Sequence, residues 1–336
     1  MSLEKKAYSE ICSLLTLKEL PSHDVIFDIT EKVSGLLEKE NTAYRPSADN
    51  HSPGGLINLN NSSLLSIIVP DLHARPDFLH NILDFHLPDG SSVFHALWNK
   101  KLNVIFVGDI LHSERNTRER WLKIADEFAV ENYTGENISA EMQDGLSLLC
   151  GLLKLKELFP ENCQILKGNH ENILNATGNG DFGFKKYSDE GQMCKTFIQE
   201  FYGDDILYMI HCVERALPLM VLGKNYLVSH AEPKTAFSLC EVINCRDNKG
   251  VIEGLTWTAN DDAEDGSVPQ IIKKMTGLDD VSDFVYIGGH RPVTGKYNLR
   301  QNGMFVQIHN PSLQNIAIIN SEKKFNPETD IVEVNI

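Results

Sequence analysis

The sequence predicts an α/β fold in which one mixed β-sheet system is covered by helices on its outside. Three observations support this prediction. Short apolar runs recur at wide intervals, segments of helical periodicity lie between some of them, and one closely spaced pair of runs is joined by a turn. Continuous aliphatic runs are typical of strands buried on both faces, and strands that alternate with helices are typical of α/β architectures.

Taken in order, residues 1–60 form an N-terminal extension. Within it, "SEICSLLTLKEL" and "VIFDITEKVSGLLEKE" have helical periodicity, and a Ser/Pro/Gly/Asn-rich stretch that follows is typical of a loop. The main domain is expected to begin near Ser62. Further along, apolar runs predict strands at 64–69, 102–107, 164–166, 217–222, 226–229, 284–287, 304–308 and 316–319.

Helical character returns in "TRERWLKIADEFAV" and "SAEMQDGLSLLCGLLKLKELF", which are separated by the polar "ENYTGEN". The segment "LPLMVLGKNYLVS" predicts a β-hairpin that turns through residues 223–225. We therefore expect a helical extension and loop over 1–61, and one main domain over 62–322. This domain contains a helical insert at about 117–160, and a C-terminal tail follows over 323–336.

Composition narrows the class of protein. The chain has 336 residues, 42% of them hydrophobic, 7 cysteines, and a formal net charge of −16. A charge of this sign disfavours binding to nucleic acid or to anionic membranes. The odd number of scattered cysteines, with no C-x-x-C pair, disfavours a disulfide framework and a zinc ribbon. No apolar stretch approaches the roughly 18 residues that span a bilayer, and the N-terminus has no apolar signal core, so we expect a cytoplasmic protein.

Side chains that can bind a metal or move a proton follow several of the apolar runs, where the predicted strands end. Because sites assemble at the carboxyl ends of strands in open α/β sheets, we expect these side chains to converge. Each alone is also explained as a turn residue, a helix cap or a half-buried histidine, so the evidence lies in their conjunction. They are Asp71, His73, Asp109, Asn169, His170, Glu171, His230 and His290.

This set of donors suits two adjacent divalent or mixed-valence metal ions. Carboxylates and neutral imidazoles bind Mn, Fe or Zn, and an amide oxygen completes the set. Two such ions about 4 Å apart hold a bridging water, lower its pKa and bind the oxygens of a phosphoryl group during in-line displacement. The sequence therefore indicates the hydrolysis of a phosphate ester.

The same residues carry a resemblance to the calcineurin-like metallophosphoesterases and, within them, to the phosphoprotein phosphatases. The family pattern of G-D-x-H-G, G-D-x-V-D-R-G, G-N-H-E, H-G-G and a late His is similar, in the same order, to "PDLHA", "GDILHSE", "GNHE", "SHAEP" and "GGHRP". The resemblance extends over about residues 64–310. It implies the calcineurin-like fold, a central mixed β-sandwich flanked by helices, and the activity of a dinuclear-metal phosphatase.

The resemblance also implies roles for individual residues. His170 would be the general acid that protonates the leaving-group oxygen, while a hydroxide between the two metals attacks phosphorus directly. Glu171 would act from outside the set of metal ligands. The implied ligands are Asp71, His73 and Asp109 for the first ion, and the bridging Asp109, Asn169, His230 and His290 for the second.

The chain departs from the family pattern beside the implied general acid. His112 replaces the aspartate that orients and charges the catalytic histidine. An imidazole there can hold His170 but cannot supply a fixed negative charge, so we expect a lower or acid-shifted pH optimum, with Glu114 as a substitute carboxylate. Pro70, Ala74 and Ala231 stand where the family has glycines that permit close backbone approach.

A further departure concerns the phosphate. Ser113 stands where the family has a phosphate-gripping arginine, and Arg75, Arg115 and Arg291 are the candidates to replace it. The substrate is therefore expected to be a small phosphoester, a nucleotide or a phosphoprotein. A protein Ser/Thr phosphatase, a nucleotide or dinucleoside polyphosphate hydrolase, and a phosphatase-like binding module without turnover all remain open.

The remaining segments are expected to have no part in the chemistry. The N-terminal extension is open to interpretation as a pair of docking helices, and the sequence predicts no oligomeric state. Histidines outside the motifs, His211 and His309 among them, are expected to be ordinary residues in or beside strands.

Overall fold

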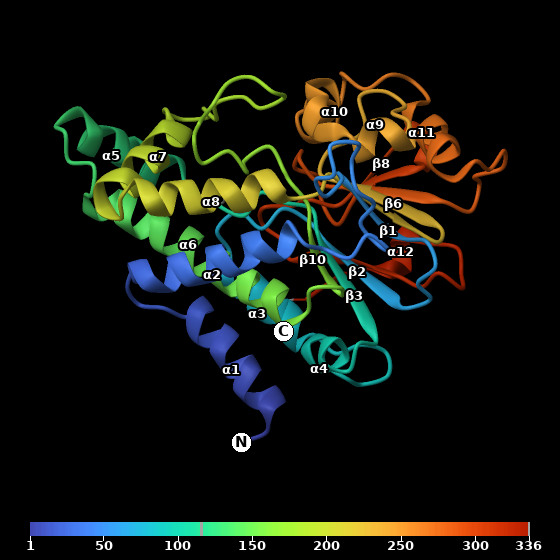
Figure 1. Ribbon diagram of the computed structural model, residues 1–336, viewed down its shortest axis with the longest axis horizontal. Coiled ribbons are helices and arrows are strands. Elements are labelled where there is room, and N and C mark those ends of the chain that lie inside the picture. The colour runs from blue at the N-terminus through green and yellow to red at the C-terminus, as the bar shows by residue number, and fades with distance from the viewer. Residues whose placement is uncertain (115–116, 335–336) are drawn as a thin grey trace.

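Figure 1 shows the computed structural model, which describes residues 1–114 and 117–334. Within these residues, the strands form one sheet of five strands and one of six. We call them sheet I and sheet II. Sheet I consists, in spatial order, of β11 (Ile331–Glu333), β10 (Asn315–Ile319), β2 (Leu65–Val69), β3 (Leu102–Phe106) and β4 (Cys163–Ile165). Sheet II consists of β1 (Leu56–Leu59), β5 (Met220–Gly223), β6 (Tyr226–Ser229), β7 (Val285–Gly288), β9 (Phe305–Gln307) and β8 (Asn298–Arg300).

Helices cover the outer faces of both sheets (Figure 1). The first group, which shares one apolar cluster with sheet I, is α1 (Leu3–Leu15), α2 (His23–Leu37), α3 (Pro76–Asp84), α4 (Val93–Trp98), α5 (Arg118–Ala129), α6 (Glu136–Leu158), α7 (Glu190–Phe201) and α8 (Asp204–Ala216). Beside sheet II lie α9 (Leu239–Ile243), α10 (Lys249–Thr256) and α11 (Ser267–Thr276), and near the C-terminus lies α12 (Pro327–Asp330). The predicted α/β class, a mixed β-sandwich flanked by helices, is confirmed.

The apolar runs are continuous because both faces of the central strands are buried. In β2, Ile67 and Val69 pack against the helices while Ile68 packs between the two sheets. In β6, Leu227 packs beneath α10 and α11, and Val228 packs between the sheets. Successive side chains of a strand point to opposite faces. The layers are therefore helices, sheet I, sheet II and helices.

The apolar runs predicted the strands of the two central layers. Each of them coincides with a strand among β2–β7, β9 and β10, and the predicted hairpin is the antiparallel pair β5–β6, in which Met220 lies opposite Ser229. The prediction of a loop before Ser62 is wrong in part, because β1 lies there and pairs in parallel with β5. Residues 56–59 include only three apolar residues, among Gly, Asn and Ser, and do not stand out as a run.

The N-terminal helices share the core of the main body. Ile11 of α1 and Ile26 and Val33 of α2 are fully buried in the same apolar cluster as the residues of α6 and α8. Figure 1 shows α2 lying along α6 and α8. The domain boundaries at 61/62 and 322/323 stay predictions, and β11 in the expected tail pairs with β10. Among the described residues, no helix is both long enough and apolar enough to span a bilayer.

A buried ion cluster joins the segment after α2 to α6. Glu40 accepts from Arg45 Nη1 at 2.6 Å and from Lys156 Nζ at 2.6 Å, and each of these side chains is only 1% exposed. The Arg45 guanidinium also donates to the carbonyl of Ala216 at the end of α8. One carboxylate is thus the shared ion-pair partner of two buried cationic side chains.

Replacing Glu40 with Ala should destabilise the protein by about 3–5 kcal/mol, because it leaves buried cations without a counter-ion. Denaturant unfolding followed by tryptophan fluorescence measures the change. The control is Glu119→Ala, which removes a solvent-exposed ion pair with Lys123 on α5 and should leave the unfolding midpoint unchanged. Equal midpoints for the two variants would show that the buried cluster has no stabilising role.

Candidate metal centre

The polar residues that follow the strands meet at one edge of the β-sandwich. Strands β2, β3 and β4 run parallel in sheet I, and β6, β7 and β9 run parallel in sheet II. Their carboxyl ends therefore lie at common edges of the sheets. The residues that these ends present are Asp71 and His73 after β2, Asp109 after β3, Asn169 and His170 after β4, His230 after β6, His290 after β7, and His309 after β9.

One group of donor atoms lies between the two sheets. Asn169 Oδ1 is 2.9 Å from both His230 Nε2 and His290 Nδ1, and the two histidine nitrogens are 3.2 Å apart. His230 Nδ1 lies 3.0 Å from the carbonyl oxygen of Val107. Because a carbonyl only accepts, this contact puts the proton on Nδ1 and leaves the lone pair of His230 Nε2 facing the group.

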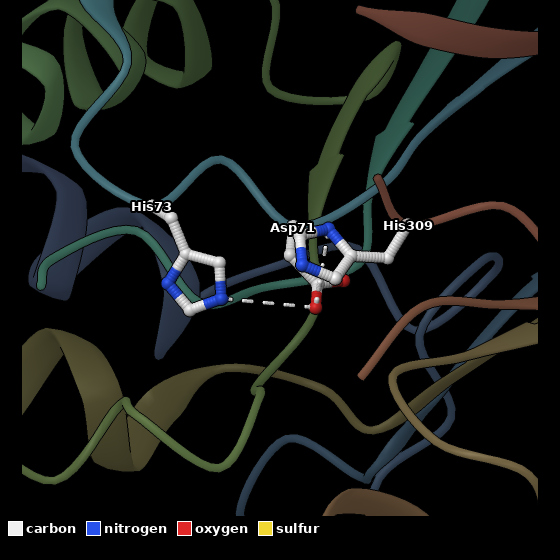
Figure 2. A group of neighbouring side chains, drawn as sticks. All are labelled: Asp71, His73 and His309. Atoms are coloured by element: carbon white, nitrogen blue, oxygen red, sulfur yellow. Dashed lines mark ion pairs between the residues drawn. The ribbon is translucent and has the colours of Figure 1, made fainter. Parts of the chain in front are cut away.

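A second group lies on the side of sheet I. His73 Nε2 is 3.9 Å from Asp71 Oδ2 and 3.6 Å from Asp109 Oδ2. The other ring nitrogen, His73 Nδ1, donates to the carbonyl of His112 at 2.9 Å, which again leaves a lone pair on the inward nitrogen. Figure 2 shows His73 and Asp71 facing each other in this arrangement.

Asp109 stands between the two groups. Its Oδ2 is 3.6 Å from His73 Nε2, 3.5 Å from His230 Nε2 and 3.8 Å from His170 Nε2. Its other oxygen, Oδ1, accepts from the backbone N–H of His170 at 2.9 Å. One carboxylate oxygen therefore faces donors from both sheets.

Glu171 fixes the two loops that carry Asp109 and Asn169. Its Oε2 accepts from the backbone N–H groups of Asp109 at 2.8 Å and Gly168 at 2.6 Å, and its Oε1 accepts from Ile110 at 2.8 Å. The loops touch at Gly108, where an added Cβ would lie 2.4 Å from the nitrogen of Gly168. Burial raises the pKa of Glu171, and the three donors oppose that shift.

Strained backbone conformations occur at this edge of the sheets. Several site residues have positive φ, a region that costs a non-glycine residue about 1–3 kcal/mol. Ala74 is among them, at a position where the resemblance expects glycine, which adopts this conformation without penalty. The strained residues, with φ in degrees, are His73 (45), Ala74 (51), Asp109 (52), His112 (65) and His290 (65).

His170 and His112 lie in direct contact. Their Nδ1 atoms are 3.1 Å apart, so one ring donates to the other. Burial lowers the pKa of His112 to about 4, and burial followed by the neighbouring histidines lowers the pKa of His170 well below its usual value. The ring of Phe184 packs on His170 with centroids 3.9 Å apart. The contact expected from the sequence is thus present, between two neutral rings.

Glu114 lies beside the group of donors that contains Asp71 and His73. Its Oε2 is 2.8 Å from His309 Nε2 and 3.5 Å from His73 Nε2, and its Oε1 accepts from Lys186 at 2.6 Å. Burial alone would raise the pKa of Glu114, but these cationic or donating partners hold it well below its usual value. No hydrogen bond or ion pair joins Glu114 to His170 in the described structure. Its charge therefore lies away from the position of the missing family aspartate.

The candidate phosphate-binding residues have different surroundings. Arg75 is buried, and its guanidinium donates to the carbonyls of Asp71, Leu72 and Leu313, which anchors the loop after β2 to the chain before β10. These partners hold the guanidinium against backbone carbonyls, and a phosphate-binding role of Arg75 stays a prediction. Arg291 is exposed next to His290. Arg115 lies outside the described residues.

The donor atoms fit divalent cations. Asp71 and Asp109 are fully buried, and burial raises the pKa of both because a carboxylate is poorly solvated there. The rings around them are neutral, since burial lowers the pKa of His73 and of His290 to about 3. Buried carboxylates and imidazole lone pairs that face one another are stabilised by a cation between them.

Sequence reasoning missed His309, although the same signal was present. It follows the apolar run 304–308 just as the other site residues follow theirs. In the structure it is fully buried beside Asp71 and His73, whereas His211, set aside with it, lies on α8. The criterion that site residues follow the carboxyl ends of predicted strands, applied to the run that forms β9, predicts His309 as well.

Replacing Glu171 with Gln should destabilise the protein by about 1–3 kcal/mol, because an amide nitrogen cannot accept and leaves at least one of the three buried N–H donors unpaired. Thermal unfolding of the metal-free protein measures this change without any contribution from bound ions. Glu200→Gln, at an exposed position on α7, is the control. Unchanged stability of Glu171→Gln would mean that the loops hold their positions without this carboxylate.

Comparison with known proteins identifies the fold. No protein-family model and no curated protein sequence match the chain. Among solved structures, a protein serine/threonine phosphatase from Saccharomyces cerevisiae with similarity to human phosphatase PP5 aligns over 99% of this chain and 95% of its own, with 16% identity and a TM-score of 0.57. A cold-active protein-tyrosine phosphatase of a psychrophilic Shewanella species (84% and 82% coverage, 12% identity, TM-score 0.47) and a putative diadenosine tetraphosphatase (83% and 97%, 13%, 0.40) align less well. The chain has the fold of this yeast phosphatase.

Proposed function

We propose that this protein is a metal-dependent phosphoesterase that binds two divalent ions and hydrolyses phosphomonoesters. The observation that carries the proposal is the position of Asp109, whose Oδ2 faces donors of both groups at 3.5–3.6 Å. A shared carboxylate is what a dinuclear site requires. The fold, common to a serine/threonine phosphatase, supports the same class of reaction.

The ligands of the two ions follow from the two groups of donors. When bound, ions of the Mn, Fe or Zn type would activate water and neutralise the charge of the phosphate. His230 is held in its binding tautomer by the carbonyl of Val107, and Asp71 is oriented by the backbone N–H of His290 at 2.9 Å. The first ion would be held by Asp71, His73 and Asp109, and the second by Asp109, Asn169, His230 and His290.

His170 is the residue that we propose as the general acid. Its Nδ1 contacts His112, and its Nε2 faces Asp109 and the two groups of donors. In the protonated ring, Nδ1–H donates to His112 and Nε2–H is directed to the leaving-group oxygen. Because His112 is neutral and burial disfavours the imidazolium, His170 carries its proton only at lower pH, which supports the expected acid-shifted optimum.

The phosphorylated substrate would meet cations at the rim of the site. The hydroxyl and the backbone N–H of Ser113 are both engaged by Glu141, so this residue does not replace the family arginine. Lys186, which is 40% exposed, stands beside Glu114, and Arg291 is exposed next to His290. We propose these two side chains as the groups that attract phosphate, on a small molecule, a nucleotide or a phosphoprotein.

Asp109→Asn should lower the Mn²⁺-dependent hydrolysis of p-nitrophenyl phosphate by more than about 100-fold, because it weakens both metal sites and their charge stabilisation. The assay uses protein stripped by a chelator and reconstituted. Asp126→Asn, an exposed residue on α5, is the matched control and should retain full activity. If the wild-type protein binds two ions but shows no turnover, the proposed phosphoesterase activity is contradicted. A phosphatase-like binding module would then be favoured.

His112→Asp should extend activity to higher pH. A carboxylate within hydrogen-bond reach of His170 raises its pKa, by about 1–3 units for a close opposite charge. The general acid would then remain protonated further into the alkaline range. The pH at which kcat falls on the alkaline side should therefore be higher. The profile is measured from pH 5 to 9 with saturating Mn²⁺, and His112→Asn controls for the loss of the ring. If the pH profiles of kcat for the Asp and Asn variants superimpose, the assignment of His170 as the general acid is contradicted.

A further inference from the structure

His309 is buried beside the group of donors that contains Asp71 and His73, yet none of the family motifs found in the sequence includes it. It follows β9 of sheet II and has no exposed surface. Its ring centroid lies 5.3 Å from that of His73, and Figure 2 shows both rings directed at Asp71. Donor atoms of Asp71, His73 and His309 all lie within 4.8 Å of one another. Side chains from both sheets therefore converge on this point.

The hydrogen bond to Glu114 determines which nitrogen of His309 carries the proton. Nε2 lies 2.8 Å from Glu114 Oε2, and a carboxylate accepts, so Nε2–H donates. The lone pair of the neutral ring is then on Nδ1. This buried atom has no hydrogen-bond partner among the described residues, and it lies 3.7 Å from Asp71 Oδ2.

The spacing between His309 Nδ1 and Asp71 Oδ2 suits a cation that both atoms bind. At 3.7 Å the pair is too far apart for a hydrogen bond. Two lone pairs that face each other in a buried site repel unless a positive charge lies between them. Donors about 2.1 Å from one ion are themselves roughly 3–3.5 Å apart, and the spacings of Asp71, His73 and Asp109 in this group are only slightly wider, at 3.6–3.9 Å.

We propose that His309 is an additional ligand of the first metal ion, bound through Nδ1, and that Glu114 is the residue that positions it. This inference rests on the proposed function and deepens it. Histidine ligands commonly donate their outer N–H to a carboxylate, which fixes the tautomer and raises the basicity of the metal-binding nitrogen. Lys186 in turn holds the other oxygen of Glu114 at 2.6 Å. The first ion would then be held by Asp71, His73, Asp109 and His309.

Two substitutions separate the ligand atom from the rest of the ring. In His309→Gln the side-chain amide can still reach Glu114 but leaves no donor at the Nδ1 position, whereas in His309→Asn the amide oxygen lies close to the place of Nδ1. Competition with a fluorescent chelator gives two Mn²⁺ dissociation constants for each protein. His309→Gln should weaken one of the two steps by at least about 10-fold, since loss of a positioning partner alone costs 10–100-fold. His309→Asn should recover part of this loss.

Reference variants identify the affected step. The step weakened by His309→Gln should be the one weakened by Asp71→Asn, and Asn169→Ala should weaken the other. His211→Ala removes a half-buried histidine on α8 and should change neither constant. Thermal unfolding of the metal-free proteins verifies that each variant is folded, and Glu114→Gln should weaken the same step as His309→Gln.

The outcomes distinguish this inference from the proposed function. Wild-type protein that binds two ions, with both constants unchanged in His309→Gln, would overturn the His309 ligand and leave the dinuclear site intact. If Glu114→Gln weakens Mn²⁺ binding and His309→Gln does not, the ligand is Glu114 and not His309. This result would also overturn the inference. Wild-type protein that binds fewer than two ions would overturn the proposed function itself, and the inference with it.

Discussion

The site depends on the hydrogen bonds that the carboxylate of Glu171 accepts from the backbone. This carboxylate lies buried between the loops that follow β3 and β4 and accepts three backbone N–H groups, from Gly168, Asp109 and Ile110. These bonds fix the two loops at the separation that lets Asp109 Oδ2 face the donors of both sheets. Without this constraint, the strained backbone of Asp109 could relax and the shared oxygen would leave its place.

The strained backbone of the site is held in place because the sheets that carry it are packed on both faces. Sheet I shares an apolar cluster with the helices on its outer side, and the two sheets bury each other. The packing around Asp71 leaves no room for a side chain at Gly289, where an added Cβ would lie 1.8 Å from Asp71 Oδ1. A rigid sandwich thus supplies fixed positions for carboxylates that are unfavourable in isolation, and bound cations would offset that cost.

The sequence predicts the parts of the fold and site that have a local signal. Long apolar runs identify the central strands, and the order of polar residues after them brings Asp71, Asp109 and His230 together correctly. Strand β8 carries no such run, because it is a largely exposed edge strand. The partners of Arg75 could not be predicted, since Leu313 is 238 residues away in the chain. His309 follows an apolar run as the other site residues do, but it was not predicted because it lies outside the motifs that carry the resemblance.

Anomalous diffraction from crystals grown with Mn²⁺ tests the central claim most directly. The account predicts two peaks about 4 Å apart, one on each side of Asp109 Oδ2. The first should lie among Asp71, His73 and His309, and the second among Asn169, His230 and His290. A single peak away from Asp109, or none at saturating Mn²⁺, would contradict the dinuclear site on which the proposed function rests.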